Sequence, residues 1–393
     1  MKAKERINEL VKDYYIAARD AKLRGEKVGW VTSNFPQEII QTMGLCVIYP
    51  ENHAATVAVR GEDRIYCAKA EGAGFSNDIC SYARVNIGNC LRDEMSGEEI
   101  PLPDYLLCCS NICHQLLKWY QYLERTYHIP MILIDIPYNT DYETDEVRLE
   151  YIRTQFYEAI EQLKVITKKE FDENRFYEVM KISNETGCLW NKISDLLGED
   201  NTAMSGTDLF VYMGIVVCQR GREETRDALK LLYDELVRKN EKNKEKGRRG
   251  WDYRILYEGI CCWPGLAKLS LSLAGYGINM AGAVYTNAYG IEYETFEDML
   301  RAYTYVPNAV SMERARDMRL SEIEKKKCDG VFVHMSRTCK IWSGIMYEMI
   351  YQIEEKTGLP VITFDGDQSD RACFSEAQYD TRLQGFYELL RER

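Results

Sequence analysis

The spacing of apolar residues divides the chain into three parts. The first part alternates short apolar runs with stretches of helical spacing. Almost wholly apolar runs of this length are typical of strands buried on both faces of a parallel sheet. The runs lie at 27–33, 46–50, 104–110 and 129–137, with helices expected up to about Leu23, from Ser81 onward and over 115–128. This alternation predicts an α/β lobe.

The strand pattern fades in the middle of the chain and then returns. Stretches such as VRLEYIRTQFYEAIEQLKVIT and ETRDALKLLYDELVRKN show helical spacing of apolar positions. The charged run at 239–250 is predicted to be a solvated linker rather than a functional basic patch. Four further strands are predicted at 253–260, 278–286, 328–336 and 359–367. The expected fold is α/β, with two Rossmann- or flavodoxin-like lobes with parallel sheets (1–143 and 250–393) and a helical middle subdomain (144–249).

Composition narrows the class of protein. A length of 393 residues exceeds what one hydrophobic core usually serves, and 46% hydrophobic residues supply material for packed cores. The net charge of −12 argues against nucleic acid as a partner. No run approaches the roughly 18 apolar residues of a membrane span, and the start MKAKERINELVKDYY lacks an apolar signal core. We therefore expect a cytoplasmic protein with no membrane partner.

Fourteen cysteines are many for a protein of a reducing compartment, where they indicate metal sites or reactive thiols more than disulfides. Most are expected to be small buried hydrophobes, including Cys46, Cys188 and Cys218. Three others differ, because Cys80, Cys113 and Cys339 each stand where a polar turn opens a helix, the last two directly after a predicted strand. A helix N-terminus favours a thiolate. The spacing alone is a weak signal, since no CxxC…CxxC pattern is present.

Six stretches together resemble the 2-hydroxyacyl-CoA dehydratase family, which includes benzoyl-CoA reductase subunits. They are GWVTSNFPQEII, YPENHAA, GFSNDICSYAR, DYLLCCSNICHQLLKWY, FVHMSRTCKIWSG and FDGDQSDRACFSEAQYDTRLQGF. The resemblance covers nearly the whole chain. It is closest to the α-type subunit, through DGDQ and SEAQYDTR near the C-terminus.

The resemblance implies a [4Fe-4S] cluster held between the lobes by Cys80, Cys113 and Cys339, with the fourth iron position open to a water or hydroxide that substrate displaces. It also implies roles near the substrate hydroxyl for Ser33 and Glu51. The implied partners are a homologous second subunit, an acyl-CoA substrate and an ATP-dependent iron–sulfur activator that injects the electron. This chain has no GxxxxGK[ST] phosphate loop for that step.

The implied reaction is a hydro-lyase reaction that converts a 2-hydroxyacyl-CoA to the 2-enoyl-CoA and water. One electron added to the thioester carbonyl gives a ketyl radical anion, which can expel the α-hydroxyl. The enoxy radical that remains makes the β-hydrogen acidic. Glu51 is the candidate acid/base group and His53 the second. Their structural alternatives are a helix N-terminal acid for Glu51 and a hydrogen-bonded core histidine for His53.

Other functions of the same superfamily stay open at this point. One is a benzoyl-CoA-reductase-like subunit. Another is an electron-transfer subunit that does not touch substrate. A third is a double-cubane cluster protein, for which Cys109 or Cys261 would be extra ligands. The DGDQSD run at 365–370 is expected to be a turn after a strand, because it lacks the rest of a calcium loop.

Overall fold

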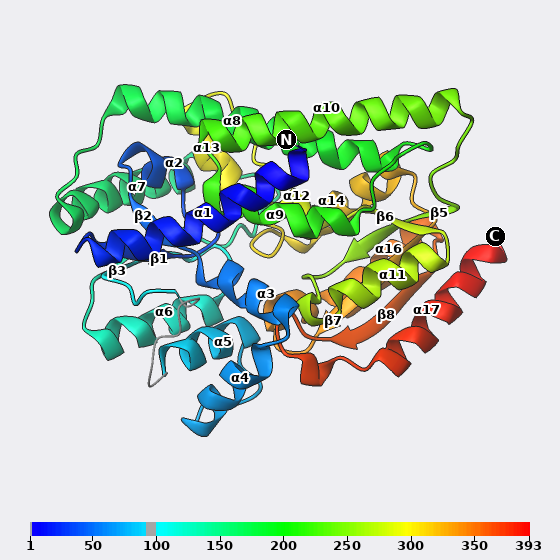
Figure 1. Cartoon of the computed structure of the whole chain (residues 1–393), viewed down its shortest axis with the longest axis horizontal. Helices are drawn as coiled ribbons and strands as arrows, with labels where there is room; N and C mark the ends of the chain where they lie inside the picture. The colour runs from blue at the N-terminus through cyan, green and yellow to red at the C-terminus, as the bar shows by residue number, and fades with distance from the viewer. Residues whose placement is uncertain (1, 92–99) are drawn as a thin grey trace.

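A computed structural model describes residues 2–91 and 100–393 and contains two four-stranded parallel sheets (Figure 1). The first sheet has the order β2-β1-β3-β4, and the second has the order β6-β5-β7-β8. The strands are β1 (Val28–Val31), β2 (Cys46–Ile48), β3 (Tyr105–Cys109), β4 (Met131–Ile134), β5 (Tyr253–Glu258), β6 (Ile278–Gly282), β7 (Gly330–Ser336) and β8 (Val361–Gly366). All eight lie within the predicted runs, so the predicted α/β fold with two parallel sheets is confirmed.

Helices cover both faces of each sheet, as buried parallel strands require. The first lobe carries α2 (Gln37–Thr42), α3 (Pro50–Arg60), α4 (Asp63–Gly72), α5 (Ser81–Cys90) and α6 (His114–Tyr127). The second carries α11 (Leu266–Gly275), α12 (Val284–Asn287), α13 (Phe296–Tyr303), α14 (Met312–Lys326), α15 (Lys340–Ser343), α16 (Met346–Thr357) and α17 (Glu376–Arg391). Among the described residues, no helix is both long and apolar enough to cross a membrane.

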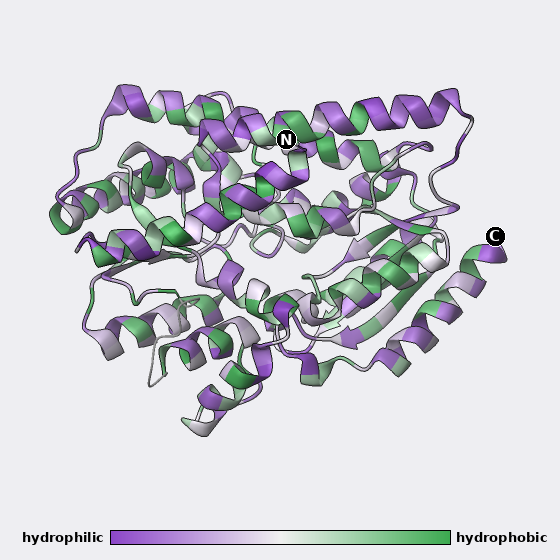
Figure 2. Ribbon diagram, viewed as in Figure 1, coloured by the Kyte–Doolittle hydropathy of each residue, from purple (hydrophilic) through white to green (hydrophobic). Residues whose placement is uncertain are grey.

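The middle of the chain forms a layer of long helices along one side of the molecule (Figure 1). These are α7 (Glu146–Thr167), α8 (Glu173–Asp195), α9 (Thr207–Gln219) and α10 (Glu223–Glu245). The N-terminal helix α1 (Ala3–Leu23) packs against α9 and α10, although it precedes the first strand. In Figure 2, α10 alternates hydrophilic and hydrophobic residues, the pattern of a helix that buries one face. The domain bounds at 143 and 249 stay a prediction.

Two local predictions were wrong. The charged run at 239–250 is not a linker throughout, because α10 continues to Glu245 before Gly247 adopts a positive φ of 60°. Its lysines and glutamates favour helix, and the buried Asn240 anchors it by donating to Glu199 and accepting from the Ala203 N–H. The strand predicted over 278–286 ends at Gly282, and the short helix α12 follows.

A buried ion pair ties the helical layer to both lobes. Glu38 on α2 and Arg220 after α9 are 3.5 Å apart, and neither is more than 2% exposed. Ser183 of α8 and the tyrosines Tyr293 and Tyr303 donate hydrogen bonds to the same carboxylate. Burial raises the pKa of Glu38, but Arg220 and the hydroxyl donors outweigh burial and leave it lowered. The segment following β1 is thereby fixed against the rest of the molecule.

The two sheets have the same strand order, so the point at which ligands are expected to bind lies at the equivalent strands of each sheet. In each sheet the chain leaves the first strand toward one edge and then crosses to the other, so the connections diverge between β1 and β3 and between β5 and β7. Ligands of open α/β sheets bind beyond the carboxyl ends of the strands at this switch point. Ser33 and Cys113 follow β1 and β3, and Cys339 follows β7.

Candidate active site

One cavity of about 730 Å³ receives residues from the strand ends of both sheets. Five of the six predicted site residues line it: Ser33, Glu51, Cys80, Cys113 and Cys339. The remaining lining is mainly apolar and aromatic, and includes Ile112, Leu116, Trp119, Val306, Ile341 and Trp342. The structure therefore brings together residues that are widely separated in the sequence and come from both lobes.

The three cysteines occupy equivalent local positions. Cys80, Cys113 and Cys339 are the N-cap residues of α5, α6 and α15, respectively. Backbone N–H groups of the first helical turns are directed at the sulfurs, from Ala83 toward Cys80 and from Leu116 toward Cys113. These N–H groups have no partner within a helix, so an N-cap sulfur can use them. This position at helix starts agrees with the sequence prediction.

Burial nevertheless dominates the protonation of these thiols. It raises the pKa of Cys80 to about 12 and that of Cys113 to about 11, and it holds the pKa of Cys339 well above the usual range. The proximity of Cys113 raises the pKa of Cys80 further, and both raise that of Cys339. The three thiols are thus close enough to repel one another as thiolates, which is the situation that a bound cationic centre would relieve.

The cysteines assigned to packing lie away from this cavity. Cys46, Cys188 and Cys218 do not line it, and neither do Cys109 and Cys261, the candidates for a second cluster. Cys109 and Cys261 are 0% exposed within the core. In the described part of the chain, no three His, Cys, Asp or Glu side chains are placed to hold a single metal ion.

Ser33 and Glu51 form a hydrogen-bonded pair at the cavity wall. The Ser33 N–H donates to Glu51 Oε2 at 2.7 Å, and the Ser33 hydroxyl donates to Oε1 at 3.0 Å. Glu51 lies in the first turn of α3, where the helix dipole favours an ionised acid. Burial is the larger effect and raises its pKa from 4.5 to about 7, although both Ser33 hydrogen bonds oppose the rise. A carboxyl with this pKa can both give and take a proton near neutral pH.

A second cavity, of about 920 Å³, is also lined by this pair. Ser33, Glu51, Tyr82, Tyr285 and Tyr289 line both cavities. The second cavity also contacts Val59 and Val211, which are 54% and 49% exposed and place its opening at the surface. A route therefore leads from solvent to the wall shared with the cysteine cavity.

Tyr289 extends the Ser33–Glu51 pair, because its hydroxyl donates to Ser33 Oγ at 3.3 Å. Sequence reasoning missed this residue. It lies just after the short helix α12 and beyond the strand predicted at 278–286, and one tyrosine among 28 carries no local signal. Trp119 and Trp342 were also missed.

His53 is not brought to the cavity. It lies on α3 two residues after Glu51 and is buried at 7% exposure. Its ring centre lies 6.5 Å from that of Tyr15, and it lines neither of the two cavities. This placement favours the core-histidine alternative, and its suggested role as a base stays a prediction.

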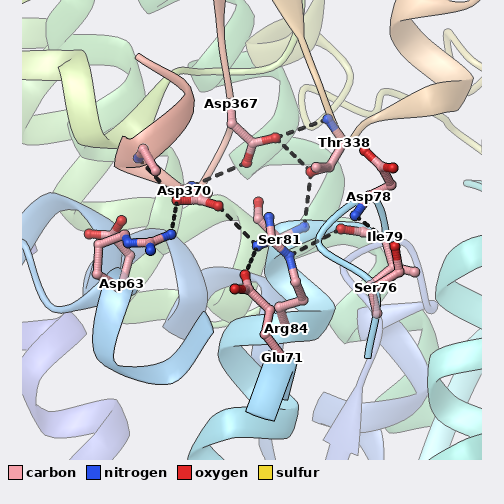
Figure 3. Close-up of polar contacts among 12 residues, drawn as sticks. Asp63, Glu71, Ser76, Asp78, Ile79, Ser81, Arg84, Thr338, Asp367 and Asp370 are labelled. Carbon is pink, nitrogen blue, oxygen red and sulfur yellow. Dashed lines mark hydrogen bonds and ion pairs between the residues drawn. The ribbon is translucent and has the colours of Figure 1, made fainter. Parts of the chain in front are cut away.

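The DGDQSD run begins with the last two residues of β8, and its remaining four residues form the expected turn, which connects the lobes (Figure 3). Asp367 is fully buried and accepts the backbone N–H and the hydroxyl of Thr338 at 2.9 and 2.6 Å. Thr338 Oγ1 in turn accepts the Ser81 N–H at 3.0 Å. Thr338 precedes Cys339 and Ser81 follows Cys80, so one carboxylate sets the spacing of two cysteines from opposite lobes.

Comparison with known proteins shows which family the chain belongs to. The family model described as 2-hydroxyglutaryl-CoA dehydratase, D-component, matches residues 32–390. The chain belongs to this family. It is 48% identical to the (R)-phenyllactyl-CoA dehydratase alpha subunit of Clostridium sporogenes, over 99% of this chain and 96% of the relative.

Two further relatives show the range of the family. The (R)-2-hydroxyisocaproyl-CoA dehydratase alpha subunit of Clostridioides difficile is 44% identical, over 98% of this chain and 96% of the relative. A benzoyl-CoA reductase subunit of Thauera aromatica is 24% identical, over 98% and 94%. The resemblance of the six sequence motifs is thus confirmed, and the dehydratase alpha subunits are more similar than the reductase subunit.

The raised pKa of Glu51 predicts a pH-dependent effect of Glu51→Gln on stability. Between pH 4.5 and about 7 the unfolded chain loses a proton that the folded chain keeps, so wild-type stability falls as pH rises. The Glu51→Gln variant has no carboxyl at this position, so its stability does not fall with pH for this reason. We expect the stability of Glu51→Gln relative to wild type to rise by up to about 3 kcal/mol between pH 5 and pH 8.

Urea unfolding at pH 5 and pH 8, on preparations of equal iron content, measures the difference. Glu158→Gln, at an exposed position on α7, is the matched control and should show no such trend. A relative stability of Glu51→Gln that stays constant or falls between pH 5 and pH 8 would contradict the raised pKa and would instead support the helix N-terminal role.

Proposed function

We propose that this chain is the cluster-bearing α-type subunit of a hydro-lyase that converts a 2-hydroxyacyl-CoA to the 2-enoyl-CoA and water. The observation that carries the proposal is the shared cavity, where three helix-capping cysteines face the hydrogen-bonded pair of Ser33 and Glu51. The membership of the family and the similarity to dehydratase alpha subunits support it.

The residues present fit a [4Fe-4S] cluster held by Cys80, Cys113 and Cys339. The donor set is all-thiol, which suits iron–sulfur chemistry. The thiols are close enough to raise the pKa of Cys339, and all three line a single cavity. When bound, the cluster would supply one electron at a time and a Lewis-acidic iron close to the substrate hydroxyl.

The protein's own part in the reaction is proton handling and exclusion of water. A protonated Glu51 can give the proton on its carboxyl oxygen to the departing α-hydroxyl, which leaves as water. The resulting carboxylate can accept the β-proton, so Glu51 ends in the state in which it began. Ser33 holds the carboxyl in place through two hydrogen bonds, and the Tyr289 hydroxyl orients Ser33. The apolar walls keep this exchange away from bulk water.

The second cavity is the proposed path for the coenzyme A arm. It joins the surface to the Ser33–Glu51 wall and is lined mostly by apolar residues, with Arg60 as its one cation among the described lining residues. A thioester reaching in from this side would place its carbonyl at the wall shared by the two cavities. Its acyl side chain would then extend along the cysteine cavity.

The lining of the cysteine cavity favours an uncharged acyl side chain. Among the described lining residues there is no Lys, Arg or His, whereas Trp119, Leu116 and Ile341 supply apolar surface. A second carboxylate on the substrate would be buried without a cation and close to Glu51, which is costly. We therefore propose an aliphatic or aromatic 2-hydroxyacyl group rather than 2-hydroxyglutaryl.

Two partners complete the proposal. The relatives are named alpha subunits, which supports a homologous second subunit. An ATP-dependent iron–sulfur activator would deliver the electron, since this chain carries no phosphate loop. The proposed setting is the cytoplasm. The lower identity to the reductase subunit makes ring reduction the weaker alternative, and the positions of Cys109 and Cys261 outside the cavity give no support to a double cubane.

The ligand assignment is tested by iron retention. Cys80→Ser, Cys113→Ser and Cys339→Ser should each lose the cluster absorbance on anaerobic purification, because each removes one of three thiols at the cavity. Cys46→Ser, Cys188→Ser and Cys218→Ser are the controls and should keep about four irons per chain, the content of one [4Fe-4S] cluster. Full iron in a Cys339 variant would show the assignment to be wrong.

The acid/base assignment is tested by the turnover of Glu51→Gln. The amide keeps the size of the side chain but cannot transfer a proton. Loss of a positioned acid/base group typically costs ~10²–10⁴ in rate, so we expect kcat to fall at least ~10²-fold with KM little changed. The assay needs the second subunit, the activator, ATP and a strong reductant. A Glu51→Gln enzyme with unchanged kcat would remove this residue from the mechanism.

The substrate class is tested by competing thioesters in the same assay. We expect kcat/KM for 2-hydroxyisocaproyl- or phenyllactoyl-CoA to exceed that for 2-hydroxyglutaryl-CoA by at least ~10²-fold, because the unpaired carboxylate costs several kcal/mol to bury. Lactoyl-CoA, which is small and uncharged, separates a requirement for size from one for charge. Comparable use of 2-hydroxyglutaryl-CoA would contradict the proposed class.

A further inference from the structure

Gln368 is the one residue of the DGDQSD turn that lines the cysteine cavity. Its side chain is fully buried, and its Nε2 lies 3.2 Å from the sulfur of Cys80. An amide N–H is a donor, and a sulfur that binds a metal can only accept. The contact is therefore an N–H···S hydrogen bond directed at one of the three proposed ligands.

The orientation of the amide follows from both of its neighbours. A metal-bound thiolate can only accept, so the amide nitrogen must face Cys80. The hydroxyl of Ser336, the last residue of β7, donates to Gln368 Oε1 and supports the same orientation. Ser336 is also fully buried. With its oxygen satisfied on this side, the amide presents its NH₂ group to Cys80.

The backbone beneath Gln368 is equally constrained. Asp367 Oδ1 accepts the N–H groups of Ser369 and Asp370, so the turn wraps around the carboxylate. Ser369 N–H also donates to the Ser81 hydroxyl at 3.0 Å. Figure 3 shows the Asp367 carboxylate reaching Thr338 on one side and the Asp370 segment on the other. The turn that carries Gln368 is thus fixed to the residue that follows Cys80.

We propose that Gln368 is a positioning and tuning residue that donates a hydrogen bond to the Cys80 thiolate and so raises the reduction potential of the cluster. This rests on the cluster of the proposed function. Reduction adds one electron and no proton, which increases the negative charge on the sulfurs. A hydrogen bond to sulfur stabilises the more negative state, so the reduced form gains more than the oxidised form.

The experiment compares three variants with wild type on the full-length chain. Iron and sulfide are used to reconstitute the cluster anaerobically, and iron is counted. A potentiometric titration with Ti(III) citrate as the electron donor is then followed by electron paramagnetic resonance. Gln368→Met keeps the side-chain volume and removes the donor. Ser336→Ala keeps the amide but frees its orientation. Gln384→Met, at an exposed position on α17, is the matched control.

We expect Gln368→Met to bind four irons and to titrate at a more negative potential than wild type. Ser336→Ala should shift in the same direction by less, and Gln384→Met should not shift. An unchanged or more positive potential in Gln368→Met at full iron content would overturn the proposal. A purely structural role would lower iron content without moving the potential of the clusters that remain.

Two further outcomes are also decisive. If Gln368→Met does not hold the cluster, the potential of Ser336→Ala decides. An unshifted potential in Ser336→Ala would overturn the proposal. A more negative potential would support it. If wild type itself binds no cluster while remaining folded, the proposed function fails, and this inference fails with it. Failure of the tuning role alone is recognised by normal wild-type iron and unshifted variants.

Discussion

The buried carboxylate of Asp367 is the constraint on which the arrangement of the site depends. It lies between the two lobes with no exposed surface, so its oxygens must be satisfied by protein donors. Four groups satisfy them, namely the Thr338 N–H and hydroxyl and the N–H groups of Ser369 and Asp370. Because all four donors must fit one carboxylate, the turn has little freedom. Thr338 in turn accepts a hydrogen bond from the N–H of Ser81, the residue after Cys80, so the position of this segment also depends on Asp367.

The consequence is a site shared by two lobes but held as one unit. Two of the three cysteines come from the first lobe and one from the second, and this junction joins the Cys339 segment to the Cys80 segment. Arg84 strengthens the junction from below, since its fully buried guanidinium pairs with Asp370 at 2.9 Å (Figure 3). The Glu38–Arg220 ion pair holds α2, the helix that follows the Ser33 segment. The segments around the cavity are therefore held in place by buried ion pairs and hydrogen bonds.

Enclosure also explains the chemistry of Glu51. At the first turn of a helix an acid would normally ionise easily, yet here the loss of water around the carboxyl outweighs both the helix and the two hydrogen bonds from Ser33. The same apolar walls that raise its pKa would leave a charged acyl group without a cation. Under the proposed function, acid/base capacity and substrate class thus have one physical origin in the lining of the cavity, whose aromatic and aliphatic residues include those of α6, α15 and the loop that follows α13.

The sequence by itself determined the strands and most of the helices, although not every end. Apolar runs of strand length, such as Tyr105–Cys109, encode a buried parallel strand locally, and the polar turns after them mark where helices begin. The cysteines at those turns could therefore be placed at one edge, and the family motifs added Ser33 and Glu51. Tertiary structure alone decided that α1 joins the middle helices, that Tyr289 reaches Ser33, that His53 lies outside the cavity, and that Gln368 meets Cys80. The physical reason is that periodicity and capping act over a few neighbouring residues, whereas contacts across lobes and the desolvation that shifts a pKa depend on which distant segments pack together.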